Sequence, residues 1–290
     1  MKNKGIIYYN SGTKCLVRLL VSIHSLRKIY PKVPVTILSR GDMSHEVCEK
    51  ISSIYGADIK DVEYDVEDGR NKILLEKCLC HTKTPYDISI FLDTDTLIVR
   101  KFADDLWGYA ESHEFSVPRF SSWKSNTRPI AKRINQWALI YPDLIDKALN
   151  FGPAVNTGVF SFRKDAKIME DWFDMAVRGR RNFIPDEICC QIILHKYPHK
   201  VADQKYNASS KYSDIDDEDI RIIHYHGKKH CRLNKHGDMI FGSDKWIKVY
   251  NEIVENNVAD ILNWQPAGDR MLRKYIKLTL SRRLDAENKI

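Results

Sequence analysis

The sequence has no long apolar run, and this absence excludes a membrane-spanning helix. Of its 290 residues, 43% are hydrophobic and 29% are charged, which is typical of a soluble globular protein. The apolar stretch at residues 15–26 is interrupted by Arg18 and His24 and is too short to cross a bilayer. The N-terminus shows no secretory signal pattern, so we expect a cytoplasmic protein.

The seven cysteines form no even framework, and this excludes a disulfide-stapled secreted scaffold. Cys78 and Cys80 are two residues apart and Cys189 and Cys190 are adjacent, so neither pair has the spacing of a C-x-x-C motif. We therefore expect reduced thiols, as in most cytoplasmic proteins.

Basic residues outnumber acidic residues but form no continuous tract. The chain has 46 Lys and Arg against 39 Asp and Glu, for a net charge of +7. This excess favours an anionic partner, such as a small molecule that carries phosphate. Zinc-finger spacing and RNA-binding signatures are lacking, so nucleic acid is not expected as a partner. Internal repeats and low-complexity segments are lacking as well.

The first hundred residues alternate short apolar stretches with amphipathic segments. Apolar residues recur at helical spacing over Thr13–Tyr30, and Pro31 ends that helix. The predicted strands cover residues 6–9, 33–38, 57–62 and 88–92, and the predicted helices cover residues 13–30, 44–55 and 71–81. Such alternation predicts an α/β fold, with a parallel sheet and helices on both of its faces.

The pattern changes after residue 99. Predicted helices cover residues 102–109, 164–178 and 185–197, and predicted strands cover residues 114–118, 156–162 and 220–225. A connection rich in Ser, Asn, Arg and Trp, residues 119–128, precedes a further helix that ends near residue 150. We predict one domain over residues 1–243 and a helical extension over residues 244–290.

Two carboxylates end the most apolar of the predicted strands. Asp93 and Asp95 follow Ile90-Phe91-Leu92 and are separated by one residue. In an extended chain, residues i and i+2 project to the same side, about 6.5–7 Å apart at the backbone. Two like charges held there are costly unless a cation neutralises them, and ligands of open α/β sheets bind at the carboxyl ends of strands. The pair therefore predicts a site for a divalent cation; the alternative is an ordinary acidic turn.

The same letters allow a second interpretation. Haloacid-dehalogenase-like phosphatases place a D-x-D-x-T motif after an apolar strand, and Asp93-Thr94-Asp95-Thr96 fits it. In that family the motif is on the first strand, and a later acidic motif holds magnesium. Here three strand–helix units precede Asp93, and the later candidates Asp238 and Asp244 are weakly spaced. The phosphatase is therefore the alternative rather than the first interpretation.

Several motifs occur in an order that is more specific than any one of them. They are Tyr8–Gly12, Lys77, Phe91–Asp95, Asp104–Trp107, Asn156–Phe160, Pro185–Glu187 and His224–His230. In order and spacing they resemble the GT-A-fold glycosyltransferases of the glycogenin and lipopolysaccharide-galactosyltransferase-like family (family 8), over roughly residues 5–232. This resemblance implies a Rossmann-like GT-A fold with a mixed, mostly parallel central sheet, helices on both faces and a helical C-terminal extension.

The resemblance also implies a function and a set of ligands. It implies a transferase that moves a sugar, with retention of configuration, from a nucleotide sugar to a glycan or lipid-linked acceptor. The donor would be a UDP-sugar, and Mn²⁺ or Mg²⁺ would be bound by Asp93, Asp95 and His224. The residues implied in donor binding are Tyr9, Asn10, Lys77, Asp93, Thr94, Gly227, Lys228 and Lys229.

The last motif departs from the family at one position. The family has a lysine three residues after the loop glycine, whereas this chain has His230 there and places Lys228 and Lys229 one and two residues after Gly227. Either lysine could supply a point charge to the β-phosphate. The glycine suits a close approach of backbone to phosphate.

Asn156, Asp186 and Glu187 are the candidates for groups at the reacting sugar. Each has a plainer explanation: Asp186 and Glu187 could be first-turn acids worth about 0.3–1 kcal/mol to a helix, and Asn156 could cap a strand. If the enzyme inverts configuration instead, Asp186 or Glu187 is the natural general base.

Two regions bear on the acceptor and on localisation. Residues 119–137 mix aromatic and basic side chains, which suits packing against sugar rings, although these aromatics could equally belong to the core. Residues 270–284 have the spacing of an amphipathic helix with a cationic rim. Such a helix could rest on an anionic membrane surface or dock on the domain itself.

Overall fold

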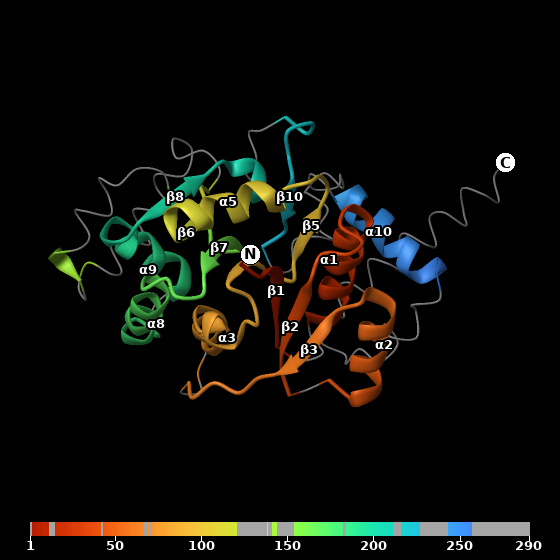
Figure 1. Cartoon of the computed structure of the whole chain (residues 1–290), viewed down its shortest axis with the longest axis horizontal. Helices are drawn as coiled ribbons and strands as arrows, with labels where there is room; N and C mark the ends of the chain where they lie inside the picture. The colour runs from red at the N-terminus through yellow and green to blue at the C-terminus, as the bar shows by residue number, and fades with distance from the viewer. Residues whose placement is uncertain are drawn as a thin grey trace, which may run out of the picture.

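The computed structural model describes residues 2–11, 15–41, 43–66, 69, 71–120, 138, 141–143, 154–181, 184–210, 216–226 and 243–256. Among these residues, a seven-stranded sheet in the order β3-β2-β1-β4-β7-β6-β8 forms the centre of the molecule (Figure 1). The strands are β1 (Lys4–Ser11), β2 (Val35–Arg40), β3 (Asp58–Asp61), β4 (Ile88–Leu92), β6 (Phe115–Pro118), β7 (Val159–Arg163) and β8 (His199–Ala202). β4, the strand that carries the acidic pair, is therefore the middle strand.

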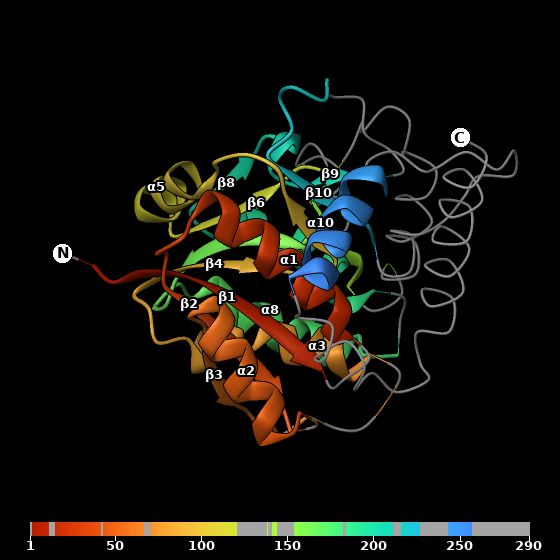
Figure 2. The same ribbon diagram turned by 90° about the vertical axis from the view of Figure 1, so that its right-hand side faces the viewer.

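Helices cover both faces of this sheet, as predicted. The described helices are α1 (Leu16–Ile29), α2 (His45–Tyr55), α3 (Lys72–Cys78), α4 (Cys80–Lys83), α5 (Ala103–His113), α8 (Ile168–Arg178), α9 (Pro185–Ile193) and α10 (Ser243–Glu255), with short 3₁₀ turns η2 (Leu194–Lys196) and η3 (Gln204–Tyr206). Figure 1 shows α1, α2 and α10 on one side of β1–β3 and α3, α8 and α9 on the other. α10 packs beside α1 (Figure 2).

Alternate residues of the central strands enter two separate cores. Ile6 and Tyr8 of β1 belong to the core under α1 and α2, whereas Ile7 and Tyr9 belong to the core under α3, α8 and α9. A strand that is buried on both faces reads as a continuous apolar run. This explains why β1 and β4 were both predictable from sequence.

The sheet is mixed, because β7 runs against its neighbours. β1, β2, β3 and β4 pair in parallel, whereas β7 is antiparallel to both β4 and β6. The parallel pairing that the alternation predicts for the first hundred residues is confirmed, and so is the mixed, mostly parallel sheet that the resemblance implies.

A second, three-stranded sheet lies beside the first, in the order β5-β10-β9. Its strands are β5 (Thr96–Ile98), β9 (Ala208–Ser209) and β10 (Ile222–His224). β10 pairs antiparallel with β5 and in parallel with β9. This sheet joins the chain just after the acidic pair to a segment more than a hundred residues later.

Several predicted boundaries change. β5, β8 and β9 are absent from the sequence prediction; the helix predicted over residues 71–81 divides at Leu79 into α3 and α4; and the helix predicted over residues 185–197 ends at Ile193. Short strands such as β9 depend on pairing with distant partners, which sequence periodicity does not report.

The C-terminal extension is described only through α10. None of the helices among the described residues is both long and apolar enough to cross a membrane. The domain boundary at residue 243 remains a prediction, and residues 270–284 lie outside the described residues, as do residues 121–137.

Candidate active site

The turn between β4 and β5 carries the acidic pair and is held by backbone hydrogen bonds. The N–H of Asp93 donates to the carbonyl of Gly158 on the neighbouring chain segment, at 2.7 Å. The carbonyl of Asp93 accepts from both the N–H (3.2 Å) and the side-chain hydroxyl (2.8 Å) of Thr96. The two carboxylates therefore project from a turn with a fixed backbone.

A chain of buried hydroxyls ties this turn to the body of the domain. Thr96 Oγ1 lies 3.0 Å from Ser22 Oγ on α1, and Ser22 Oγ lies 3.1 Å from the hydroxyl of Tyr8 on β1. The threonine that completes the phosphatase-like D-x-D-x-T lettering thus has a structural role here.

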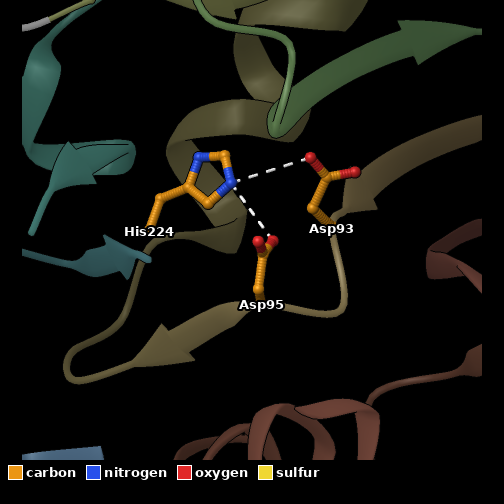
Figure 3. Close-up of side chains that lie close together, drawn as sticks. All are labelled: Asp93, Asp95 and His224. Atoms are coloured by element: carbon orange, nitrogen blue, oxygen red, sulfur yellow. Dashed lines mark ion pairs between the residues drawn. The ribbon is translucent and has the colours of Figure 1, made fainter. Parts of the chain in front are cut away.

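The three-stranded sheet brings His224 to the acidic pair. In the pairing of β10 with β5, His224 stands opposite Thr96, and the N–H of Tyr225 donates to the carbonyl of Asp95 at 3.0 Å. Figure 3 shows the imidazole of His224 pointing between the carboxylates of Asp93 and Asp95, which project towards it from the turn between β4 and β5. The residues predicted as metal ligands are therefore brought together.

The distances among these three side chains fit a small divalent cation. His224 Nε2 lies 3.2 Å from Asp95 Oδ1 and 3.7 Å from Asp93 Oδ2 (Figure 3), and one ligand atom from each residue lies within 4.8 Å of the others. Octahedral ligands at about 2.1 Å from Mg²⁺ are about 3 Å from their neighbours. Carboxylate oxygens and imidazole nitrogen are suitable ligands for Mn²⁺ or Mg²⁺.

Lys77 places a buried cation behind the acidic pair. Its side chain on α3 lies 3.1 Å from both oxygens of Asp93 and 3.4 Å from Asp186 Oδ2, and only 4% of the residue is exposed. Burial lowers the pKa of this ammonium, but the charges of Asp93 and Asp186 outweigh it and raise the pKa above its ordinary value. Lys77 is therefore charged at neutral pH.

The pKa values of Asp93 and His224 are both shifted, because the site brings several buried charges together. Burial raises the pKa of Asp93 to about 6, with Asp95 adding to the effect and Lys77 opposing it. Burial lowers the pKa of His224, but the carboxylates of Asp95 and Asp93 raise it to above its ordinary value. In the absence of a metal, protons bound to Asp93 and His224 therefore neutralise part of the negative charge at this site.

Asp186 and Glu187 begin α9, next to the same turn. Pro185 occupies the first turn of the helix, and Ile184 before it has the left-handed backbone φ of 48°, which is unusual for a β-branched residue. Asp186 Oδ2 accepts from the hydroxyl of Thr157 at 3.0 Å, whereas its Oδ1 is buried and has no hydrogen-bond partner among the described residues. Such an oxygen is available to a hydroxyl of a bound molecule.

These residues line one cavity of about 530 Å³. Its walls include Tyr9, Ser11, Cys15, Arg18, Ile73, Leu74, Lys77, Phe91, Asp93, Thr94, Asp95, Phe120, Asn156, Thr157, Gly158, Ile184, Asp186, Glu187, His224 and His226. Among the described residues that line it, and with neutral histidines, the four acids outnumber Arg18 and Lys77 by two formal charges. A divalent cation would balance that difference, so the residues present fit the metal that the GT-A fold implies.

Only some of the residues predicted to contact the donor line the cavity. Tyr9 and Thr94 line the cavity, and the Tyr9 hydroxyl donates to the buried carboxylate of Glu76. Asn10 is fully buried and is not one of the lining residues. Gly227, Lys228 and Lys229 lie outside the described residues.

Gly158 and His226 are site residues that the sequence did not single out by role. A Cβ on Gly158 would lie 2.1 Å from His224 Cε1, so the imidazole occupies the space of the missing side chain. The ring of His226 lies 4.2 Å from that of His224, with an interplanar angle of 31°, and its Nε2 is hydrogen-bonded to Ser209 Oγ at 2.8 Å. Both are part of motifs in the sequence, the N-[ST]-G motif for Gly158 and the His224–His230 motif for His226, but the sequence assigned neither a role of its own.

Arg18 is a further cavity residue that was missed. It lines the cavity from the first turn of α1. Its only signal in the sequence was a charge that interrupts an apolar helical stretch.

Comparison with known proteins identifies the fold. No protein-family profile matches the chain, and no curated protein matches its sequence. The structure of the galactosyltransferase LgtC with donor and acceptor sugar analogues is similar, with a TM-score of 0.58 and 11% identity, over 86% of this chain and 95% of LgtC. Mouse xyloside xylosyltransferase 1 has a TM-score of 0.56 and 12% identity, over 80% of this chain and 99% of that protein.

A third structure extends the comparison to a longer protein. The glycosyltransferase GlyE of Streptococcus pneumoniae has a TM-score of 0.57 and 14% identity, over 89% of this chain and 64% of GlyE. At these identities the likeness concerns the fold. The chain has the fold of GT-A glycosyltransferases, which confirms the fold that its motifs imply.

Proposed function

We propose that this GT-A-fold chain is a metal-dependent glycosyltransferase that moves a sugar from a UDP-sugar to a hydroxyl of a glycan or lipid-linked acceptor. The observation that carries the proposal is the convergence of Asp93, Asp95 and His224 within 4.8 Å in one cavity. The fold supports it, because similar solved structures are those of glycosyltransferases.

The three converging side chains would hold the cation against the donor diphosphate. When bound, Mn²⁺ or Mg²⁺ supplies positive charge that stabilises the leaving nucleoside diphosphate. Asp93 is oriented for this by Lys77, which lies 3.1 Å from both of its oxygens. We assign the second positive charge on the diphosphate to Lys228 or Lys229, beside Gly227.

The nucleobase end of the donor is assigned to the carboxyl end of β1. Tyr9 lines the cavity there, and its hydroxyl is anchored on Glu76, so its ring has little freedom to move. Thr94, between the two acidic ligands, lines the same cavity. Asn10 would contribute through its backbone or through support of the strand end, because its side chain is buried.

The sugar end of the donor is assigned to Asp186 and Glu187. The free Oδ1 of Asp186 can accept a sugar hydroxyl, while Lys77 and Thr157 hold its Oδ2. Glu187 Oε2 accepts from Asn156 Nδ2 at 3.3 Å and also faces the cavity. We propose a retaining transfer; if the reaction inverts, one of these two carboxylates becomes the general base.

The phosphatase alternative is weakened by the position of the acidic pair. In that family the motif follows the first strand, whereas Asp93 follows β4, the fourth strand in chain order. Asp244, the described candidate for the later acidic motif, is on α10 and is not among the residues that line the cavity. Asp238 lies outside the described residues.

One experiment separates the candidate activities. The protein is incubated with a panel of nucleotide sugars and Mn²⁺, and release of nucleoside diphosphate is measured with and without EDTA. We expect EDTA-sensitive release from one donor, lost in Asp95→Asn and kept in Asp58→Asn, which changes an exposed carboxylate on β3. Phosphomonoester hydrolysis that disappears in Asp93→Asn would indicate the phosphatase instead. A protein with neither activity would be a binding module.

A further inference from the structure

Asn156 lies at the centre of a buried hydrogen-bond network beside the candidate metal site. Its Oδ1 accepts from the N–H of Gly158 at 2.9 Å and from Asn207 Nδ2 at 2.7 Å, and lies 3.1 Å from His224 Nδ1. Asn156, Asn207 and His224 are only 5%, 2% and 4% exposed. A carboxamide oxygen with two lone pairs is saturated by three such neighbours.

The partners of Asn156 fix the orientation of its amide. A backbone N–H can only donate, so the atom that faces Gly158 must be the oxygen. The amide nitrogen on the other side donates to the carboxylate of Glu187 at 3.3 Å. His224 Nδ1 therefore faces an acceptor, and in the metal-free site so does Nε2, which lies 3.2 Å from Asp95 Oδ1. A cation held by the two carboxylates would displace the proton from Nε2, and the ring proton would then be on Nδ1, with the lone pair of a neutral imidazole on Nε2. That is the nitrogen that points at Asp93 and Asp95.

Asn207 holds Asn156 in this position from the opposite side. Its Nδ2 donates to both the side-chain oxygen (2.7 Å) and the backbone carbonyl (3.0 Å) of Asn156. Asn207 comes directly before β9, whose Ser209 is paired with His224 in the three-stranded sheet. The same sheet thus delivers the imidazole and the residue that orients the acceptor of its proton.

We propose that Asn156 and Asn207 are positioning residues that set the tautomer and the direction of His224 as a metal ligand. The inference rests on the proposed function, and it moves Asn156 from contact with the donor sugar to support of the cation. Histidines that bind metals donate their second N–H to a fixed acceptor, and loss of that acceptor costs roughly 10–100-fold in metal affinity. Asn207 has no motif and no predicted role, so the structure alone assigns it.

The first test is spectroscopic and uses Mg²⁺, which is diamagnetic. Ring ¹⁵N shifts of the full-length protein saturated with Mg²⁺ are recorded at a pH high enough for neutral histidines, with His224→Gln used to assign the signals. We expect the proton of His224 on Nδ1 in the wild type and a mixture of both tautomers in Asn207→Ala at the same Mg²⁺ concentration. A wild-type His224 that keeps its proton on Nε2 in Mg²⁺ would overturn the proposal, whatever the variants do.

The second test measures Mn²⁺ affinity by the electron paramagnetic resonance signal of free Mn²⁺. Asn207→Ala should weaken binding by about 10–100-fold, as should Asn207→Ser, which serves if the alanine variant does not fold. The control is Gln204→Met, which replaces a buried side chain by one of similar length on η3, the 3₁₀ turn that precedes Asn207, and should leave Mn²⁺ affinity unchanged. Equal Mn²⁺ affinity in the wild type and both Asn207 variants would overturn the proposal.

These readouts separate the positioning role from the enzyme activity. Mn²⁺ binding that depends on Asn207, without turnover of any nucleotide sugar, would refute the proposed function and support the positioning role. Turnover of a nucleotide sugar, together with Mn²⁺ affinity that does not depend on Asn207, would support the proposed function and refute the positioning role.

Discussion

Lys77 is a single ammonium group that two carboxylates share in the interior. Lys77→Met keeps the length of the side chain but leaves Asp93 and Asp186 without their cation. Because an uncompensated buried charge is costly, we expect the free energy of unfolding to fall by about 3 kcal/mol, measured by urea denaturation. Lys83→Met, at an exposed site on α4, is the control and should change it by less than about 0.5 kcal/mol. Equal effects would contradict the role of Lys77.

Gly158 is the residue that gives the His224 imidazole its space. In Gly158→Ala the new Cβ would lie 2.1 Å from His224 Cε1, so the ring must move away from the acidic pair. We expect Mn²⁺ affinity to fall by at least about tenfold. The matched control is Gly108→Ala on α5, where a Cβ meets no atom within 4 Å. Unchanged Mn²⁺ affinity in Gly158→Ala would show that His224 is not a ligand.

The pKa shifts at the site predict how stability depends on pH. The pKa values of Asp93 (about 6) and of His224 are both raised in the folded protein, so folding favours the protonated forms. The stability that these two groups contribute without metal is therefore present at low pH and is lost as the pH rises, for Asp93 between about 4 and 6 and for His224 above its ordinary pKa. Mn²⁺ should replace these protons.

Thermal unfolding with and without Mn²⁺ measures this exchange. We expect Mn²⁺ to raise the melting temperature clearly at pH 8 and little at pH 5, where Asp93 is protonated and His224 is charged. Asp95→Asn is the comparison that should remove the effect at both pH values. A larger Mn²⁺ effect at pH 5 than at pH 8 would contradict the assignment.

At the scale of elements, the turn between β4 and β5 depends on its attachment to α1. Thr96→Val removes the hydroxyl that donates to the Asp93 carbonyl and contacts Ser22, with little change in shape. Because the Asp93 carbonyl and the Ser22 hydroxyl each lose a hydrogen-bond partner, we expect the free energy of unfolding to fall by about 1–3 kcal/mol and Mn²⁺ binding to weaken. Thr82→Val, where an exposed threonine donates to the Leu79 carbonyl, is the control. A Thr96→Val loss no greater than that of Thr82→Val would contradict this account.

The sequence predicts the elements that are stabilised locally and misses those that depend on distant partners. β1 and β4 are continuous apolar runs, and α2 has a serine at its start and Gly56 in a left-handed conformation at its end, so their patterns are visible in the sequence. β5 and β9 are three and two residues long and exist because β10 pairs with both. No periodicity can indicate such strands.

The residues of the site also fall into those that the sequence predicts and those that it does not. Asp93, Asp95 and His224 could be predicted because each is part of a motif, and Lys77 only through the family resemblance, which puts a lysine on the helix before this strand. Asn207 could not, because its role comes from where β9 places it rather than from its neighbours in sequence.

At the scale of the whole molecule, the two cores meet at the middle strand, and the cavity opens at the end of that strand. Among the described lining residues, four carboxylates stand there against Arg18 and Lys77. An anionic diphosphate would meet a net negative charge on this part of the cavity unless a cation is bound first. Metal and nucleotide should therefore bind cooperatively, and each should tighten the other by the same factor.

Calorimetric titration of UDP into the protein, with Mn²⁺ and then with EDTA, tests this central claim most directly. We predict saturable UDP binding with Mn²⁺ that weakens by at least about fivefold in EDTA, and weakens equally in Asp95→Asn with Mn²⁺ present. UDP binding of the same affinity with and without the metal would contradict the account.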